Sequence, residues 1–239
     1  MSQFSPRILY VVFGLMLLMP NSSRQTFPAS GSKSASVIRG KNPLNEIKIE
    51  SIVDQIIDMA NSQRGVKELS SGPRNRGKEV DEYNKTAGGK EGDEWCAAFV
   101  SWVMGKVDGQ NENSNLHKLK NLPQPPDFEK VAKGMGVLRE PKKYSPRKGD
   151  LLIFKWPNSE DYHIEIVTAK PTVDGIVHTI GGNTYYDDVN VSGYWRKPEG
   201  DIVYKDPQTG IANSVIGIVD IRALLMNGID SPNTNLTSR

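Results

Sequence analysis

The sequence is poor in cysteine and histidine. It has one cysteine, Cys96, and three histidines among 239 residues. Exported proteins normally carry cysteines in even, disulfide-bonded sets, and Cys96 has no partner within the chain. Most lone cysteines are small buried apolar residues, so the count alone does not decide between a structural and a catalytic role. Paired His or Cys spacings and calcium-loop patterns are also lacking, so the sequence predicts no metal and no cofactor.

Long apolar runs are absent as well. The longest run, residues 8–19, is shorter than the roughly 20 residues that a membrane-spanning helix needs. It follows Arg7 and precedes Pro20 and a Ser-rich stretch, which is the layout of a secretory signal peptide. Residues 1–20 are therefore expected to be a signal peptide or, if uncleaved, a short membrane tether. We expect export to the periplasm, the cell wall or the extracellular space.

The sequence has no dense cluster of basic or of acidic residues. Thirty basic and 28 acidic residues leave a net charge of +2, with no block dense enough to predict a nucleic-acid surface. The hydrophobic content of 37% suffices for one ordinary core. We expect a flexible Ser-rich linker over residues 21–44, one folded domain over 45–226 and a polar tail over 227–239.

Apolar residues recur at helical spacing in two segments. Residues 46–63 and 94–107 each place their apolar side chains on one stripe, which predicts two amphipathic helices. Gly92 and Asp93 are expected to break and cap the second helix, so that Cys96 lies in its first turn. A short third helix is predicted near 127–134, and the polar stretch around 75–83 is interpreted as a loop.

After Gly149 the pattern changes to short strands bounded by Gly, Pro, Asn or Asp. Five are predicted, over residues 151–156, 162–169, 175–180, 191–196 and 215–221. Helices followed by strands favour an α+β domain with an antiparallel sheet.

The position of Cys96 suits a nucleophile. Backbone N–H groups and the dipole at a helix start favour the thiolate form of a thiol, and the same N–H groups can stabilise an oxyanion. Thiolate chemistry also needs a proton acceptor. His117 lies in a polar segment and His178 lies in the middle of a strand, whereas His163 begins a strand just past a turn. His163 is therefore the preferred base.

Four motifs, in order, carry a resemblance to a known family. They are GDEWCAAFVSW from Gly92, GDLL from Gly149, HIEIV from His163 and TIGGNT from Thr179. This pattern resembles the CHAP amidase and endopeptidase domain of the papain-like NlpC/P60 group. The resemblance implies a nucleophile helix packed on a central antiparallel β-sheet and peptidoglycan as substrate. It also implies a Cys-His-Asn triad of Cys96, His163 and Asn183.

Two positions depart from that pattern. Many members of the family have Glu where this chain has Gly181, and a small residue where this chain has Glu165. Strand alternation places Glu165 on the same face as His163. Glu165 is therefore a candidate auxiliary residue that either replaces the missing acid or binds a cationic substrate group. The alternative is a solvated glutamate on an edge strand.

Trp95, Trp156 and Tyr162 are the candidate substrate-binding residues, and Trp156 is the one expected to be most exposed. The leading function is an N-acetylmuramoyl-L-alanine amidase or a peptidoglycan endopeptidase. The alternatives are a non-catalytic wall-binding module, or a cysteine protease or acyltransferase acting on another substrate, because one fold hosts several chemistries. The need for an immunity or inhibitor protein stays open.

Overall fold

The computed structural model describes residues 42–112, 114–157, 159–184, 188–197, 200–205 and 212–229. The predicted signal peptide lies outside the described residues, as does all of the predicted linker except residues 42–44. Within the described residues, no helix has both the length and the apolar character needed to cross a membrane.

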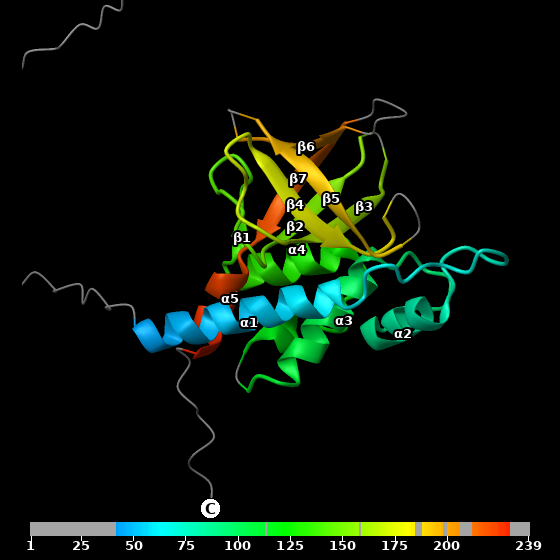
Figure 1. The fold of residues 1–239 in the computed structure, drawn as a ribbon, viewed down its shortest axis with the longest axis horizontal. Helices are drawn as coiled ribbons and strands as arrows, with labels where there is room; N and C mark the ends of the chain where they lie inside the picture. The colour runs from blue at the N-terminus through cyan, green and yellow to red at the C-terminus, as the bar shows by residue number, and fades with distance from the viewer. Residues whose placement is uncertain are drawn as a thin grey trace, which may run out of the picture. The chain divides into compact units, whose positions relative to one another are not determined.

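Helices form a layer beneath a strongly curved sheet (Figure 1). The helices are α1 (Pro43–Asn61), α2 (Lys78–Ala87), α3 (Cys96–Asp108), α4 (Pro125–Gly134) and α5 (Ile221–Ile229), with a short 3-10 helix η1 (Leu116–Lys118). The strands are β1 (Leu138–Arg139), β2 (Leu151–Lys155), β3 (Tyr162–Val167), β4 (Ile176–Gly181), β5 (Asn190–Arg196), β6 (Ile202–Lys205) and β7 (Ala212–Val219). The expected α+β class with an antiparallel sheet is confirmed.

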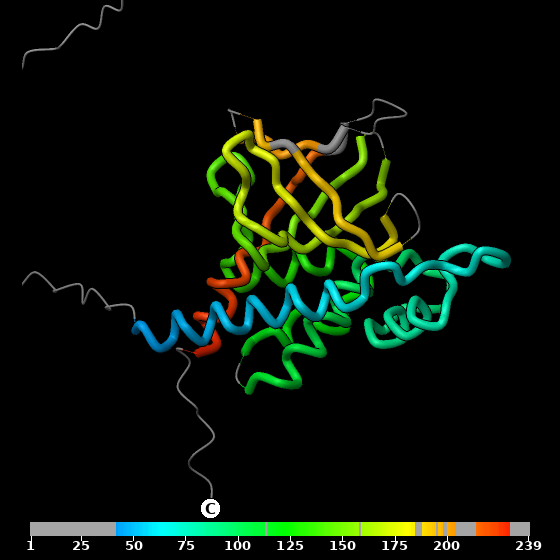
Figure 2. The backbone as a smooth tube through the Cα atoms, viewed as in Figure 1, coloured from blue at the N-terminus to red at the C-terminus, as the bar shows by residue number. Residues whose placement is uncertain are grey.

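The seven-stranded sheet closes on itself. Its strand order is β1-β7-β2-β3-β4-β5-β6, and β7 also pairs with β6. All strands except β1 therefore form a closed antiparallel barrel, and the tube in Figure 2 shows how they curl round. Closure leaves these strands without an open edge, which is one way to manage exposed backbone groups.

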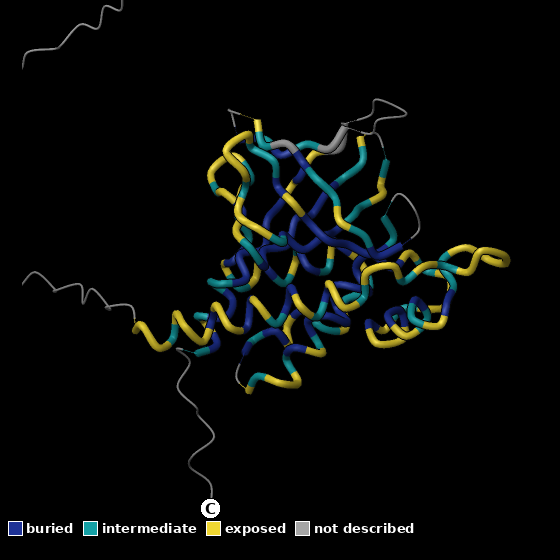
Figure 3. The backbone as a smooth tube through the Cα atoms, viewed as in Figure 1, coloured by how far each residue is buried: buried dark blue, intermediate teal, exposed yellow. Residues whose placement is uncertain are grey.

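Strand alternation divides the apolar residues between two cores. Leu151 and Ile153 of β2 belong to the core shared with the helices, whereas Leu152 and Phe154 belong to the core inside the barrel. Most helices, such as α1, bury one face and expose the other, as the blue and yellow stretches of Figure 3 show, whereas α3 is buried on almost all sides. Buried α1 residues include Ile49, at the spacing used to predict the helix.

Three sequence predictions need correction. The stretch around 75–83, interpreted as a loop, contains most of α2, whose buried Val80, Tyr83 and Ala87 lie on one face of an otherwise polar helix. The folded part begins inside the predicted linker, since Asn42 caps α1 by accepting a hydrogen bond from the Leu44 N–H. Residues 227–229, placed in the polar tail, belong to α5.

Candidate active site

Cys96 is the first residue of α3. The first hydrogen bond of the helix runs from the Phe99 N–H to the Trp95 carbonyl, so the N–H groups of Cys96 and the two alanines after it come before the helical ladder. The expected cap at Asp93 is wrong. Trp95 is the N-cap residue and makes no side-chain cap, while the Asp93 carboxylate accepts from the Lys90 N–H instead.

His163 is the second residue of β3, and it meets Cys96. The imidazole and the thiol lie close enough for each to act on the charge of the other. On its other side, His163 Nε2 lies 2.9 Å from Glu165 Oε1. Since Nε2 faces the carboxylate, Nδ1 is the ring nitrogen left for the thiol. Cys96 is only 2% exposed, and the His163 side chain is 15% exposed, so the histidine is the more open member of the pair.

The contacts of His163 favour its protonated form. Burial acts to lower its pKa, but the hydrogen bonds with Cys96 and Glu165, and the charges of both groups, outweigh burial and raise the pKa to about 10. The ring is therefore an imidazolium at neutral pH in this arrangement. An imidazolium between a thiol and a carboxylate can stabilise a thiolate and later donate its proton.

Glu165 is buried beneath His163. Its side chain is 2% exposed. Oε2 accepts a hydrogen bond from Thr179 Oγ1 of β4, and Oε1 also lies 3.4 Å from Ser192 Oγ of β5. The edge-strand reading is wrong, because β3 lies between β2 and β4 and Glu165 faces protein on all sides. Its enclosure also argues against direct contact with a cationic substrate.

Asn183 does not meet His163 in this geometry. It lies two residues beyond the end of β4 with φ = 52°, in the left-handed region that interrupts strand alternation. Its side chain makes no hydrogen bond to the described part of the chain, and the nitrogen it was expected to hold, His163 Nε2, faces Glu165. The catalytic role of Asn183 stays a prediction without a contact to support it.

Part of the chain is similar to a known protein family. Residues 87–183 match the family model of the CHAP domain. This segment is similar to the CHAP domain. The matched segment starts at the end of α2 and ends at Asn183, so it contains Cys96, His163 and Glu165. Neither a curated protein nor a solved structure matches the chain. A CHAP domain suggests peptidoglycan hydrolysis or a related activity.

The three predicted substrate-binding residues differ in how far they are buried. Trp95 is fully buried, and its indole N–H donates to Glu68 Oε1 at 2.9 Å, so its contact with substrate stays a prediction that this geometry does not support. Tyr162 and Trp156 are half-buried beside the His163 end of β3 and remain candidates. The ammonium group of Lys155 lies 5.2 Å from the centre of the Tyr162 ring.

The other two histidines lie away from the thiol. His117 is exposed in η1, with Nδ1 3.9 Å from Asp108, and His178 is exposed in the middle of β4. Neither contacts Cys96. No group of three or more His, Cys, Asp or Glu residues able to hold a metal ion occurs in the part of the chain that the structure describes.

Sequence reasoning missed the polar side chains that hold this site together. Thr179 and Ser192 are directly paired in the β4–β5 ladder, and both approach the carboxylate of Glu165. Alternation in β4 could have placed Thr179 on one face with Gly181, but the sequence does not reveal which strand lies beside β4. Glu68 was missed too, because only the fold brings it to Trp95, 27 residues later.

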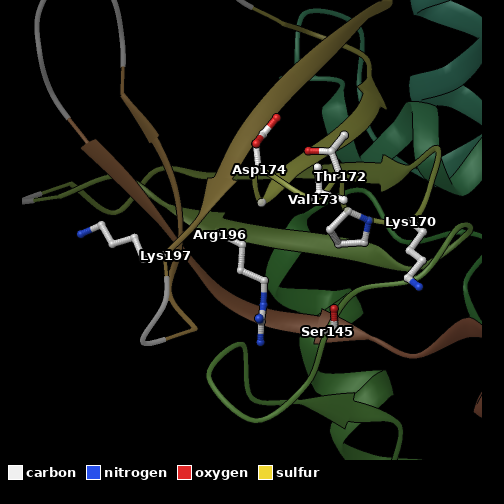
Figure 4. A pocket seen from close by; sticks show the side chains of 9 residues that line it. Ser145, Lys170, Thr172, Val173, Asp174, Arg196 and Lys197 are labelled. Atoms are coloured by element: carbon white, nitrogen blue, oxygen red, sulfur yellow. The ribbon is translucent and has the colours of Figure 1, made fainter. Parts of the chain in front are cut away.

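A separate hollow lies at the opposite ends of β4 and β5. It is lined by residues on either side of those strand ends, Lys170 to Gly175 with Arg196 and Lys197, together with Ser145 (Figure 4). Gly181, near the active site, is five residues along β4 from Ile176, or about 16 Å at the rise of a strand. This hollow is therefore not part of the Cys96–His163 site.

Proposed function

We propose that the chain hydrolyses an amide or peptide bond in the stem peptides of peptidoglycan, with Cys96 as nucleophile and His163 as base and acid. The observation that carries the proposal is the interaction between the thiol at the start of α3 and the imidazole of His163, within a segment that matches the CHAP family model. The two residues lie 67 positions apart in the sequence, yet the fold joins them. This pairing is what thiolate chemistry requires.

The reaction proceeds through a thioester. The thiolate sulfur of Cys96 forms a bond with the substrate carbonyl carbon, while the electron pair of the C=O π bond moves to oxygen. N–H groups of the first turn of α3 are available to stabilise that oxyanion. When the carbonyl re-forms, the C–N bond breaks and the proton on His163 passes to the leaving nitrogen.

Hydrolysis of the thioester completes the cycle. Neutral His163 accepts a proton from water as the water oxygen bonds to the acyl carbon. The C–S bond then breaks, which releases the carboxylic acid and restores the thiolate beside an imidazolium. An N-acetylmuramoyl-L-alanine amidase and a stem-peptide endopeptidase share these steps and differ only in the carbonyl that the cleft holds near the sulfur.

Mass spectrometry of digested peptidoglycan tests the proposal. Purified wall is incubated with wild type and with the Cys96→Ser and His163→Ala variants, and the released fragments are sequenced. We expect new amino and carboxyl termini, or lactyl ends freed of peptide, with wild type only. Binding of wall without new termini would overturn the proposal in favour of a non-catalytic module. Cleavage of a protein substrate alone would favour a different cysteine hydrolase.

We propose that the protein acts outside the cytoplasm. The support is the charged and apolar N-terminal segment, together with the single cysteine and the extracytoplasmic location of peptidoglycan. Fractionation of cells that produce the full chain tests this point. Recovery with cytoplasmic markers alone, at full length, would contradict it.

A further inference from the structure

The carboxylate beside His163 comes from the same strand as the histidine. Alternation along β3 places His163 and Glu165 on one face, two residues apart. Both are paired with residues of β2 that belong to the barrel core. His163 lies opposite Phe154, and Glu165 lies opposite Leu152. Glu165 therefore rises from a fixed position in the wall of the barrel, directly next to the histidine.

Glu165 occupies space that Gly181 leaves open. A Cβ atom added to Gly181 would lie 2.6 Å from Glu165 Cγ and 3.0 Å from Cδ, closer than real Cβ contacts. The β3–β4 ladder pairs Ile166 with Ile180, and one further step in that register sets Glu165 opposite Gly181. Directly opposite residues of antiparallel strands share a face. Side chains at positions 165 and 181 would therefore occupy the same volume, so only one of the two positions can carry a large side chain.

We infer that Glu165 is the positioning residue for His163, and that positions 165 and 181 are a reciprocal pair in which the acid can stand on either strand if the other position has no side chain. The inference rests on the proposed function only for its activity measurements. Glu165 acts through the histidine: it accepts from Nε2–H, fixes the ring and leaves Nδ1 facing Cys96.

The surroundings of Glu165 support positioning over simple burial. A carboxylate without partners in an apolar core would lose its charge, since burying an unpaired charge is costly. Here Thr179 Oγ1 donates to one oxygen, while His163 and Ser192 approach the other. These partners supply polar contacts to both oxygens and direct the carboxylate at the imidazole. Asn183, which is itself in the left-handed conformation, has no equivalent contact with the described residues.

Titration of His163 by NMR provides a test that does not depend on peptidoglycan. The isosteric variant Glu165→Gln removes the charge and keeps the volume. We expect the midpoint of the His163 titration to fall by at least about one pH unit, because an opposite charge at this distance favours the protonated ring. Glu160→Gln is the matched control, because Glu160 is 92% exposed and pairs with Lys155. An unchanged midpoint in Glu165→Gln would overturn the inference.

Activity and exchange of the acid provide the second test. Glu165→Gln should lower kcat by about tenfold or more on a purified muropeptide and change KM little, since it alters the histidine and not the binding surface. Glu165→Gly and Gly181→Glu should each lose activity, and the double variant should be about tenfold more active than either single variant. Failure of a folded double variant to exceed both single variants would refute the reciprocal pair.

The two proposals fail in distinguishable ways. If the protein does not cleave wall but the His163 midpoint falls in Glu165→Gln, the proposed function is wrong and Glu165 still positions the ring. If wall is cleaved through Cys96 but Glu165→Gln leaves the midpoint and kcat unchanged, only the positioning role is wrong. Should Gly181→Glu fail to fold, the Glu165→Gln result alone decides.

Discussion

Substitution of Gly182 by alanine should weaken both the fold and the site. A Cβ atom there would lie 2.6 Å from Trp95 Cζ3 and 2.8 Å from Phe99 Cβ, against an ordinary contact of 3.4 Å or more. Neither neighbour can move freely, because both are fully buried and the Trp95 indole N–H is held by Glu68. The start of α3 must therefore retreat from the end of β4 by somewhat less than 1 Å.

The cost can be estimated from that displacement. Inserting a methyl group into a well-packed core typically costs about 1–3 kcal/mol, so urea denaturation should show Gly182→Ala less stable by that amount. Cys96 stands next to Trp95 and would move relative to His163. A displacement approaching 1 Å in a reacting group can cost up to about 10²-fold in rate, and we expect a loss of about ten- to 100-fold in kcat/KM.

Gly134→Ala is the matched control. Gly134 is the last residue of α4, and an added Cβ atom meets nothing within 4 Å. Alanine there should leave activity unchanged and stability unchanged or slightly higher, because alanine favours helix. A Gly182→Ala variant as stable and as active as the wild type would refute the close packing of the start of α3 on the end of β4.

Two further predictions concern buried polar groups. Trp95→Phe should lower stability by about 1–2 kcal/mol and leave KM nearly unchanged, because the indole is buried and donates to Glu68; a large rise in KM would contradict this. Burial raises the pKa of Asp150 to about 6 despite its hydrogen bond from the Arg147 N–H. A raised carboxyl pKa stabilises the fold below about pH 4, and this effect is lost as the pH rises through 6. Asp150→Asn should therefore cost more stability at pH 4.5 than at pH 7.5, by up to about 2 kcal/mol. Equal losses at the two pH values in urea denaturation would refute this.

Periodicity predicted the elements whose burial is regular. α1, α3 and five of the strands were expected within a few residues of their observed ends, because one face or both faces of each are apolar. α2 was missed because its few apolar residues are separated by charged ones, and its burial comes from packing on α3, with Tyr83 against Trp95 and Phe99. β6 was also missed, since it is short and lies between segments rich in turn residues.

The site was predictable where chemistry limits the choice. One cysteine and three histidines leave few possible pairs, and strand alternation correctly placed Glu165 on the face of His163. The sequence could not exclude Asn183, because its departure from the strand depends on a left-handed backbone conformation that only the structure reveals. Closure of the barrel was equally hidden, since a pairing between β6 and β7 looks like any other hairpin in the sequence.

The closed barrel also bears on when the site can form. β7 is the last strand among the described residues, and it pairs with both β2 and β6. β2 in turn aligns β3, the strand that holds His163. Until the C-terminal strand is synthesised, β2 keeps an unpaired edge and the histidine lacks a fixed support. Cys96 is synthesised more than 100 residues before β7, so it gains a firmly supported partner only after β7 has been made, which delays any hydrolytic activity until then.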